Sequence, residues 1–187
     1  MNWRRNLGYG LGLLALIPAV VAAEVLPWRE KYEFLTGKGG QEAVAAHGQG
    51  ARVNGMEWRL KSITEGELQE EFSRPLPPRT KIAVVVISVK PLTDQGGKWF
   101  VTDGTCKIAA TDKAGRIWQP SFRNDLAPKS PHSPTCRAFD ANYNMVPLPV
   151  GKELTIQTEY VVPADAFPTL GVQIRLTPNP ATVRLNP

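Results

Sequence analysis

The sequence has few of the residues from which catalytic and metal sites are usually built. Its 187 residues include two histidines and two cysteines, whereas a structural zinc site alone takes four ligands. The chain contains no Gly-x-Ser-x-Gly elbow, no glycine-rich phosphate loop and no His-Glu-x-x-His sequence. These absences exclude the common hydrolase, nucleotide-binding and zinc-protease signatures. We therefore predict a protein that is not an enzyme and has no catalytic residue, no cofactor and no metal site.

Charge of one sign is not in large excess either. The 22 basic and 17 acidic residues leave a formal net charge of +5, and the basic side chains are scattered singly along the chain. Nucleic-acid binding requires basic residues that cluster on one face and alternate with aromatic residues. We therefore expect no nucleic-acid partner, whereas the mild positive charge is compatible with anionic lipids or cell-wall polymers.

Long hydrophobic runs are absent except near the start of the chain. Arg4 and Arg5 precede the uncharged run Leu7–Ala23, which as a helix rising about 1.5 Å per residue would span roughly 26 Å. A bilayer core is about 30 Å thick, so this run can anchor the chain in the cytoplasmic membrane. Trp28 favours an anchor, because tryptophan settles at membrane interfaces. A cleaved secretory signal is the alternative, because Pro18 precedes small residues of the kind found at cleavage sites.

Both alternatives export the rest of the chain. We divide the sequence into a membrane anchor or signal segment at 1–24, a glycine-rich juxtamembrane tether at 25–50 and an extracytoplasmic domain at 51–187. With about 137 residues, the last part is long enough for one domain with a hydrophobic core and too short for two. The predicted location is the cell membrane, single-pass with the C-terminal domain outside, or secreted if the leader is cleaved.

The domain alternates apolar and polar residues with a period of two. This alternation is clear at 56–61 and 154–162, whereas the β-branched run 82–89 is apolar on both faces. The pair Asn54 and Gly55 is typical of a two-residue hairpin turn. The predicted fold class is all-β, an antiparallel immunoglobulin-like sandwich of about seven strands, preceded by one N-terminal transmembrane or signal helix.

Cys106 and Cys136 both lie in the exported domain. Cysteines outside the cytoplasm are normally paired, so we predict a disulfide between them. Closing a loop of about thirty residues stabilises the domain by roughly 3.5 to 4 kcal/mol in the loop-entropy model. The enclosed loop has four prolines and little periodicity. The alternatives are a catalytic cysteine, or a metal or redox site formed by His132 and Cys136.

Several aromatic side chains fall in predicted loops rather than in strands. Exposed aromatic and arginine side chains anchor protein interfaces, so we predict a partner-binding surface formed by Trp99, Phe100, Phe122, Arg123, Arg137, Phe139 and Tyr143. Packing of the rings over the disulfide is the alternative. The segment Asp140–Asn144 imitates the start of a calcium loop. Because Met145 and Gly151 replace the glycine and glutamate that such a loop requires, we predict a turn there.

Three stretches of the domain resemble a known family. They are Thr80–Val89, Thr111–Trp118, and Pro149–Glu153 leading into Tyr160–Ala166. Over about 55–176, their rhythm of strands and turns resembles the telokin-like, immunoglobulin-type domain of unknown function of many bacterial surface proteins. Members are often lipoproteins, whereas this chain lacks a lipobox cysteine and is more similar to single-pass actinobacterial envelope proteins. The resemblance implies a sandwich fold and a binding or assembly role, and it assigns no functional residue.

These observations predict a membrane-tethered extracytoplasmic β-sandwich that acts as a non-catalytic protein-binding or envelope-complex accessory module. Its expected partners are an envelope protein and the cytoplasmic membrane, the latter through Leu7–Ala23. The alternative is an envelope hydrolase or ligand-binding sensor with its site in the loop between Cys106 and Cys136. A flat aromatic patch favours the protein-binding module, whereas a deep pocket or a pair of carboxylates favours the alternative.

Overall fold

The computed structural model describes residues 40–46, 48–69, 74–102, 104–123, 125–127 and 130–187. The predicted anchor at 1–24 and most of the predicted tether lie outside these ranges. Within them, no helix has the length and hydropathy needed to cross a membrane.

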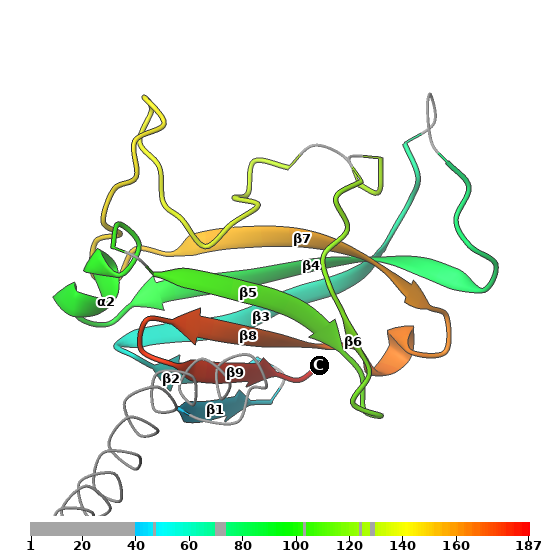
Figure 1. Ribbon diagram of the computed structural model, residues 1–187, viewed down its shortest axis with the longest axis horizontal. Helices are drawn as coiled ribbons and strands as arrows, with labels where there is room; N and C mark the ends of the chain where they lie inside the picture. The colour runs from blue at the N-terminus through cyan, green and yellow to red at the C-terminus, as the bar shows by residue number, and fades with distance from the viewer. Residues whose placement is uncertain (1–39, 47, 70–73, 103, 124, 128–129) are drawn as a thin grey trace, which may run out of the picture. The chain divides into compact units, whose positions relative to one another are not determined.

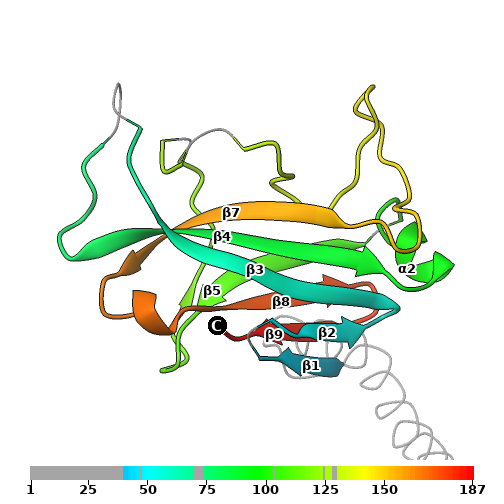
Figure 2. The ribbon, with the colours of Figure 1, turned by 180° about the vertical axis from the view of Figure 1, so that it is seen from behind.

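The described residues form two β-sheets that pack face to face (Figure 1). One sheet has the strand order β1 (Gln41–Ala45), β9 (Ala181–Leu185), β8 (Gly171–Thr177), β5 (Thr105–Thr111) and β6 (Ile117–Trp118). The other has the order β2 (Gly50–Val53), β3 (Met56–Gly66), β4 (Thr80–Pro91) and β7 (Leu154–Pro163), and Figure 2 shows β3, β4 and β7 side by side. The predicted all-β sandwich is confirmed, with nine strands in the described part rather than about seven.

The core lies between the inner faces of the two sheets, where the period-two pattern places apolar side chains. On β7, Ile156, Tyr160 and Val162 are fully buried, as the alternation predicted. The central strand β4 also buries Ile82 and Ser88 on its outer face, which agrees with the prediction of a strand covered on both sides. The hairpin between β2 and β3 turns at Asn54 and Gly55, whose φ angles are 50° and 69°. The hairpin prediction is therefore confirmed.

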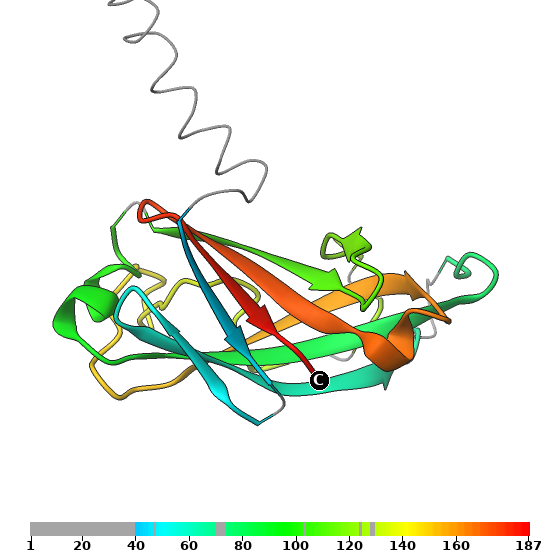
Figure 3. The same cartoon turned by 90° about the horizontal axis from the view of Figure 1, so that it is seen from below.

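The sandwich extends into residues that the sequence analysis assigned to the tether. Strand β1 pairs in parallel with β9, from Gln41 opposite Ala181 to Ala45 opposite Leu185, and Figure 3 shows the blue β1 beside the red β9. This is the one parallel pair of strands in the described sheets. Only alanines of β1 point inward, whereas Val44 is 60% exposed. The strand therefore carries too weak an apolar alternation to be recognised from the sequence.

Glu57 departs from the predicted alternation, because it is buried on the outer face of the four-stranded sheet. Its carboxylate is 4% exposed and lies 3.2 Å from Arg52 Nε, 3.1 Å from Arg59 Nη2 and 3.1 Å from Lys90 Nζ. The hydrogen bond from Lys90 lowers the pKa of Glu57, burial opposes this, and Arg52 and Arg59 lower the pKa further. The buried carboxylate thus holds three cations of β2, β3 and β4 together.

We expect Glu57→Gln to destabilise the protein at pH 7, because three cations lose their shared carboxylate. Since the folded-state pKa is depressed, the stabilisation is fully present above the unfolded-state pKa of about 4.5 and is lost as the pH falls through the folded value. The difference in free energy of unfolding between wild type and variant therefore narrows at acidic pH, as urea denaturation at pH 7, 5 and 3 would measure. The control is Glu153→Gln, which removes an exposed pair with Lys61 and has little effect. An equal loss at every pH would contradict this assignment.

Trp58 is the largest fully buried side chain, and its indole N–H has no hydrogen-bond partner among the described residues. An unpaired buried donor costs about 1–3 kcal/mol. We expect Trp58→Phe to change the free energy of unfolding by less than about 1.5 kcal/mol, because removing this donor offsets the lost volume. Trp58→Ala leaves a cavity and costs about 3–5 kcal/mol.

The matched control is Trp99→Phe. The Trp99 indole N–H donates to the Thr177 carbonyl at 2.8 Å, so the same substitution there breaks a hydrogen bond. Chemical denaturation should rank Trp99→Phe as the more destabilising change. The opposite order would mean that the Trp58 N–H contributes to stability.

Candidate functional site

The connection between β6 and β7, residues 119–153, crosses the side of the sandwich where β7 is one edge strand. On the other sheet this side is formed by β5, which the short edge strand β6 covers only at Ala110 and Thr111. The Ser121 N–H donates to the Glu159 carbonyl at 2.8 Å, and the Ser133 N–H donates to the Thr155 carbonyl at 3.0 Å. The Ser133 carbonyl accepts from the Gln157 N–H at 3.0 Å. These bonds occupy the outer edge of β7, which would otherwise offer unpaired groups to other chains.

The disulfide attaches the same connection to the other sheet. Cys106 of β5 is bonded to Cys136, with their Cα atoms 6.1 Å apart and 30 positions of sequence separation. The predicted disulfide is confirmed, and Cys136 is buried within the hydrophobic core cluster. Because the connection is hydrogen-bonded to β7 and disulfide-bonded to β5, it closes the side of the sandwich between the two sheets.

A groove with a volume of about 580 Å³ remains between the crossing points of the connection. One wall is β5 from Thr105 to Ile108, and Thr158 contributes from β7. The connection supplies the rest, chiefly Phe122, Cys136 and Arg137. The volume is typical of small-molecule sites, and the groove lies in the loop region that the sequence analysis named as the alternative site.

A hairpin at residues 138–146 projects from the connection (Figure 1). Phe139 and Met145 pair across it, and the Asp140 N–H donates to the Asn144 carbonyl at 3.0 Å. The Asp140 carboxylate accepts from the backbone N–H groups of Asn142 at 2.8 Å and Asn144 at 2.9 Å. The Asn144 N–H chiefly lowers the pKa of Asp140, against the effect of burial. Asp140 therefore organises a turn, as predicted.

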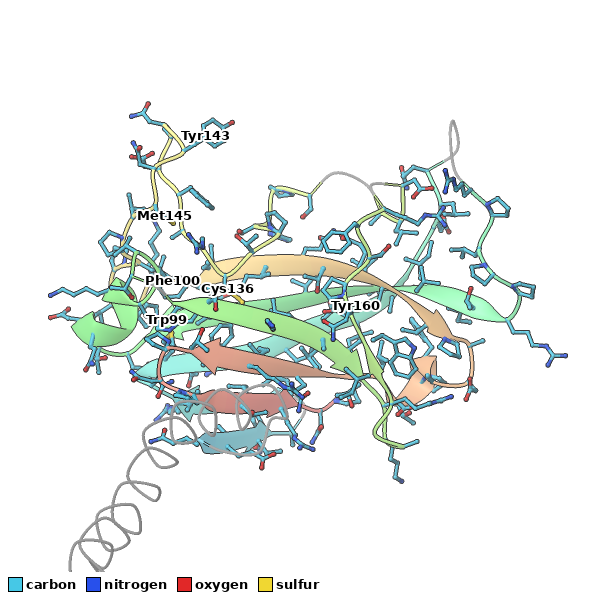
Figure 4. All side chains as sticks on the ribbon, in the orientation of Figure 1. Trp99, Phe100, Cys136, Tyr143, Met145 and Tyr160 are labelled. Carbon is cyan, nitrogen blue, oxygen red and sulfur yellow. A yellow bond between two sulfur atoms is a disulfide. The ribbon has the colours of Figure 1, made fainter. Side chains whose placement is uncertain are left out.

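Tyr143 stands at the tip of this hairpin, and Met145 lies lower on the same hairpin (Figure 4). Tyr143 has a φ of 62°, in the left-handed region that side chains other than glycine seldom adopt, and it is 87% exposed. The described chain has eight large exposed hydrophobic residues, and five of them lie on this connection. The eight are Val44, Leu92, Ile117, Phe122, Phe139, Tyr143, Met145 and Val150. Four of the eight lie within residues 122–145.

Two of the predicted interface residues do not belong to this surface. Trp99 and Phe100 are 6% and 1% exposed and lie in the core cluster. The short helix α2 (Asp94–Lys98), capped by the Thr93 side chain, delivers them there. Their rings pack edge to face with centroids 5.4 Å apart. The sequence-based assignment of an exposed loop was wrong for this pair, because a single helical turn after Thr93 points both rings inward.

The two predicted arginines have different surroundings. Arg123 forms a two-pronged pair with Asp125 at 2.6 and 2.8 Å and donates to the Arg74 carbonyl. The hydrogen bond to Asp125 raises the pKa of Arg123. Through these contacts Arg123 joins its own loop to the loop that contains Arg74. Arg137 lines the groove, and its Nη1 lies 2.6 Å from Met145 Sδ. Arg137 therefore connects the groove to the hairpin.

The structure places Phe122 and Arg137 along the groove and Phe139 and Tyr143 on the hairpin. It adds Met145, which the sequence analysis did not include. A signal for Met145 was present, because Phe139 and Met145 flank the Asx-rich turn symmetrically. Among the described residues, no group of three His, Cys, Asp or Glu side chains is placed to hold a metal ion. The groove itself is lined by hydroxyl, amide, cationic and apolar groups.

Comparison with known proteins gives a limited result. No family model matches the chain, and no curated protein matches it. An uncharacterized β-sandwich protein of Clostridium difficile is 10% identical with a TM-score of 0.36, and the match covers 79% of this chain and 94% of that one. The yjhA protein of Bacillus subtilis is 9% identical with a TM-score of 0.42, over 75% and 98% of the two chains. A conserved hypothetical protein of Bacillus anthracis is 12% identical with a TM-score of 0.42, over 70% and 88%.

Sequence identities and TM-scores this low do not support any inference about the function of this protein. The telokin-like and actinobacterial resemblance stays a prediction, because none of the comparisons assigns a family to this chain. The β-sandwich itself stands on the strand order described above.

We expect the double substitution Cys106→Ala and Cys136→Ala to lower the free energy of unfolding by about 3.5 to 4 kcal/mol, because it removes a constraint on a thirty-residue loop of the unfolded chain. Urea denaturation measures this. Mass analysis of native material should find the domain two hydrogens lighter than its reduced form. Two free thiols in protein isolated from the cell envelope would contradict both the bridge and the oxidising compartment.

Proposed function

We propose that the protein is a non-catalytic binding module of the bacterial envelope, tethered to the cytoplasmic membrane through Leu7–Ala23. Its connection at residues 122–145 contacts a partner protein. The observation that carries this proposal is that five of the eight large exposed hydrophobic side chains of the described residues lie on the connection between β6 and β7. Isolated exposed hydrophobic residues are ordinary on a protein surface, whereas a cluster of them marks an interaction site.

The hairpin supports the proposal because it presents large side chains on an ordered backbone. Asp140 satisfies two backbone donors of the turn, and the disulfide holds the base of the connection. Tyr143 therefore projects from a constrained position, and little conformational freedom is lost when a partner covers it. Tyrosine, methionine and arginine, all present here, are enriched in protein interfaces.

The exported location is proposed on two independent features. Arg4, Arg5 and the following uncharged run are typical of an export signal or anchor. The disulfide between Cys106 and Cys136 is typical of an oxidising compartment. An anchor places the domain outside the membrane, and cleavage of the leader would release it.

The second candidate function, a ligand-binding sensor, is favoured by the groove between the cysteines. The hydrolase form of that alternative has less support. Acid–base hydrolysis needs a carboxylate or an imidazole near the substrate, and none lines the groove in the described part of the chain.

The partner can be tested by crosslinking from the hairpin in intact cells. We expect a photoreactive amino acid at position 143 to crosslink strongly to one envelope protein, because Tyr143 is exposed at the hairpin tip. The matched control carries the same group at position 44, since Val44 is also exposed but lies on β1. Immunoblotting and mass spectrometry of the adducts measure the outcome. Identical adducts from both positions, or bulk surface proteins alone, would remove the support for a specific partner surface.

A further inference from the structure

The groove has a chemical character of its own, which differs from that of the hairpin. Ile108 and Thr158 face the inside of the sandwich, and Phe122 lies at the opening with 99% of its surface exposed. Pro120 and Pro134 add rigid apolar walls, and the disulfide forms part of the lining. A ligand with an apolar body can therefore be covered on several sides here.

The charged groups of the lining have one sign. Arg137 supplies the charge that faces the groove, because Lys107 alternates with the inward-facing Cys106 and Ile108 on β5. No acidic side chain lines the groove within the described residues. The Arg137 guanidinium donates to the Met145 thioether, which is a weak acceptor. The groove is therefore complementary to an anion.

The shape of the site disfavours a peptide that adds a strand to the sheet. Strand addition needs a free run of backbone donors and acceptors along an edge. Ser121 and Ser133 already occupy the edge of β7 at residues 155–159, on both sides of Thr158. A ligand that enters between these two crossings therefore depends on apolar contact and on one charged group.

We propose that the groove binds a single-chain anionic amphiphile, such as a fatty acid, with its apolar chain between Phe122 and the inward-facing side chains and its carboxylate beside Arg137. The volume of about 580 Å³ suits a small molecule. Phe122 is fully exposed without a ligand and becomes covered when the chain binds. Arg137 exchanges a thioether for a carboxylate, which is a stronger, charge-assisted partner.

Binding can be tested with three amphiphiles that share a twelve-carbon chain, namely laurate, dodecyltrimethylammonium and dodecyl maltoside. Each is titrated into the oxidised protein below its critical micelle concentration and followed by calorimetry. We expect saturable one-to-one binding of laurate and at least about tenfold weaker binding of the cationic and neutral compounds. Equal affinity for all three, or no saturable binding of laurate, would overturn the proposal.

Variants locate the site. Arg137→Gln should weaken laurate binding about tenfold or more without affecting dodecyl maltoside, because only the charged contact is lost. Phe122→Ser should weaken the binding of every compound that enters the groove, and it leaves the fold intact because the ring is exposed. The matched control is Lys113→Gln, which removes one exposed cation from the turn between β5 and β6 and should leave the affinity unchanged. Equal effects of Arg137→Gln and Lys113→Gln would reduce the interaction to general charge and refute the site.

Discussion

The closure of the sandwich between β5 and β7 is the constraint on which the rest of the structure depends. Two sheets packed face to face leave an open side wherever their edge strands do not continue into each other, and an uncovered edge exposes both core and backbone. Here one long connection closes that side. Backbone hydrogen bonds from Ser121 and Ser133 attach it to β7, and the disulfide attaches it to β5. The covalent bond supplements the burial of Ala138 and Leu148 of the same connection in the core cluster.

Because of this closure, the residues of the connection that stabilise the fold differ from the residues proposed to bind a partner. The base of the connection is fixed in the core by Cys136, so its outer part is free to expose side chains that contribute nothing to folding. Phe122 and Tyr143 are almost fully exposed, and a folded protein keeps such side chains on an ordered backbone only if the backbone is held by other contacts. The turn around Asp140 and the hydrogen bonds at β7 supply those contacts. The arrangement follows a common pattern, in which binding residues lie on loops positioned by a rigid β scaffold.

Sequence patterns predicted the elements whose cause is local. The alternation at β7 and the Asn54-Gly55 hairpin followed from side-chain period and from backbone φ requirements. The predicted disulfide followed from the even number of cysteines and from the predicted location outside the cytoplasm. The predictions failed where a distant contact decides the outcome. Trp99 and Phe100 look like loop residues beside Gly96 and Gly97, yet a five-residue helix turns them into the core. Strand β1 has little apolar pattern, and its pairing with β9 comes from the opposite end of the chain.

By itself, the sequence determined the β class, the disulfide partners and the residues available for an exposed aromatic surface, because each depends on periodicity, composition or count. The tertiary structure alone decided which aromatic side chains are exposed, and that Arg137 lies beside both the groove and Met145. It also decided that Glu57 is a buried carboxylate shared by three cations. These outcomes depend on which segments the closure of the sandwich brings together. Segments separated by many residues meet only when the whole chain has folded, so no local pattern encodes their contact.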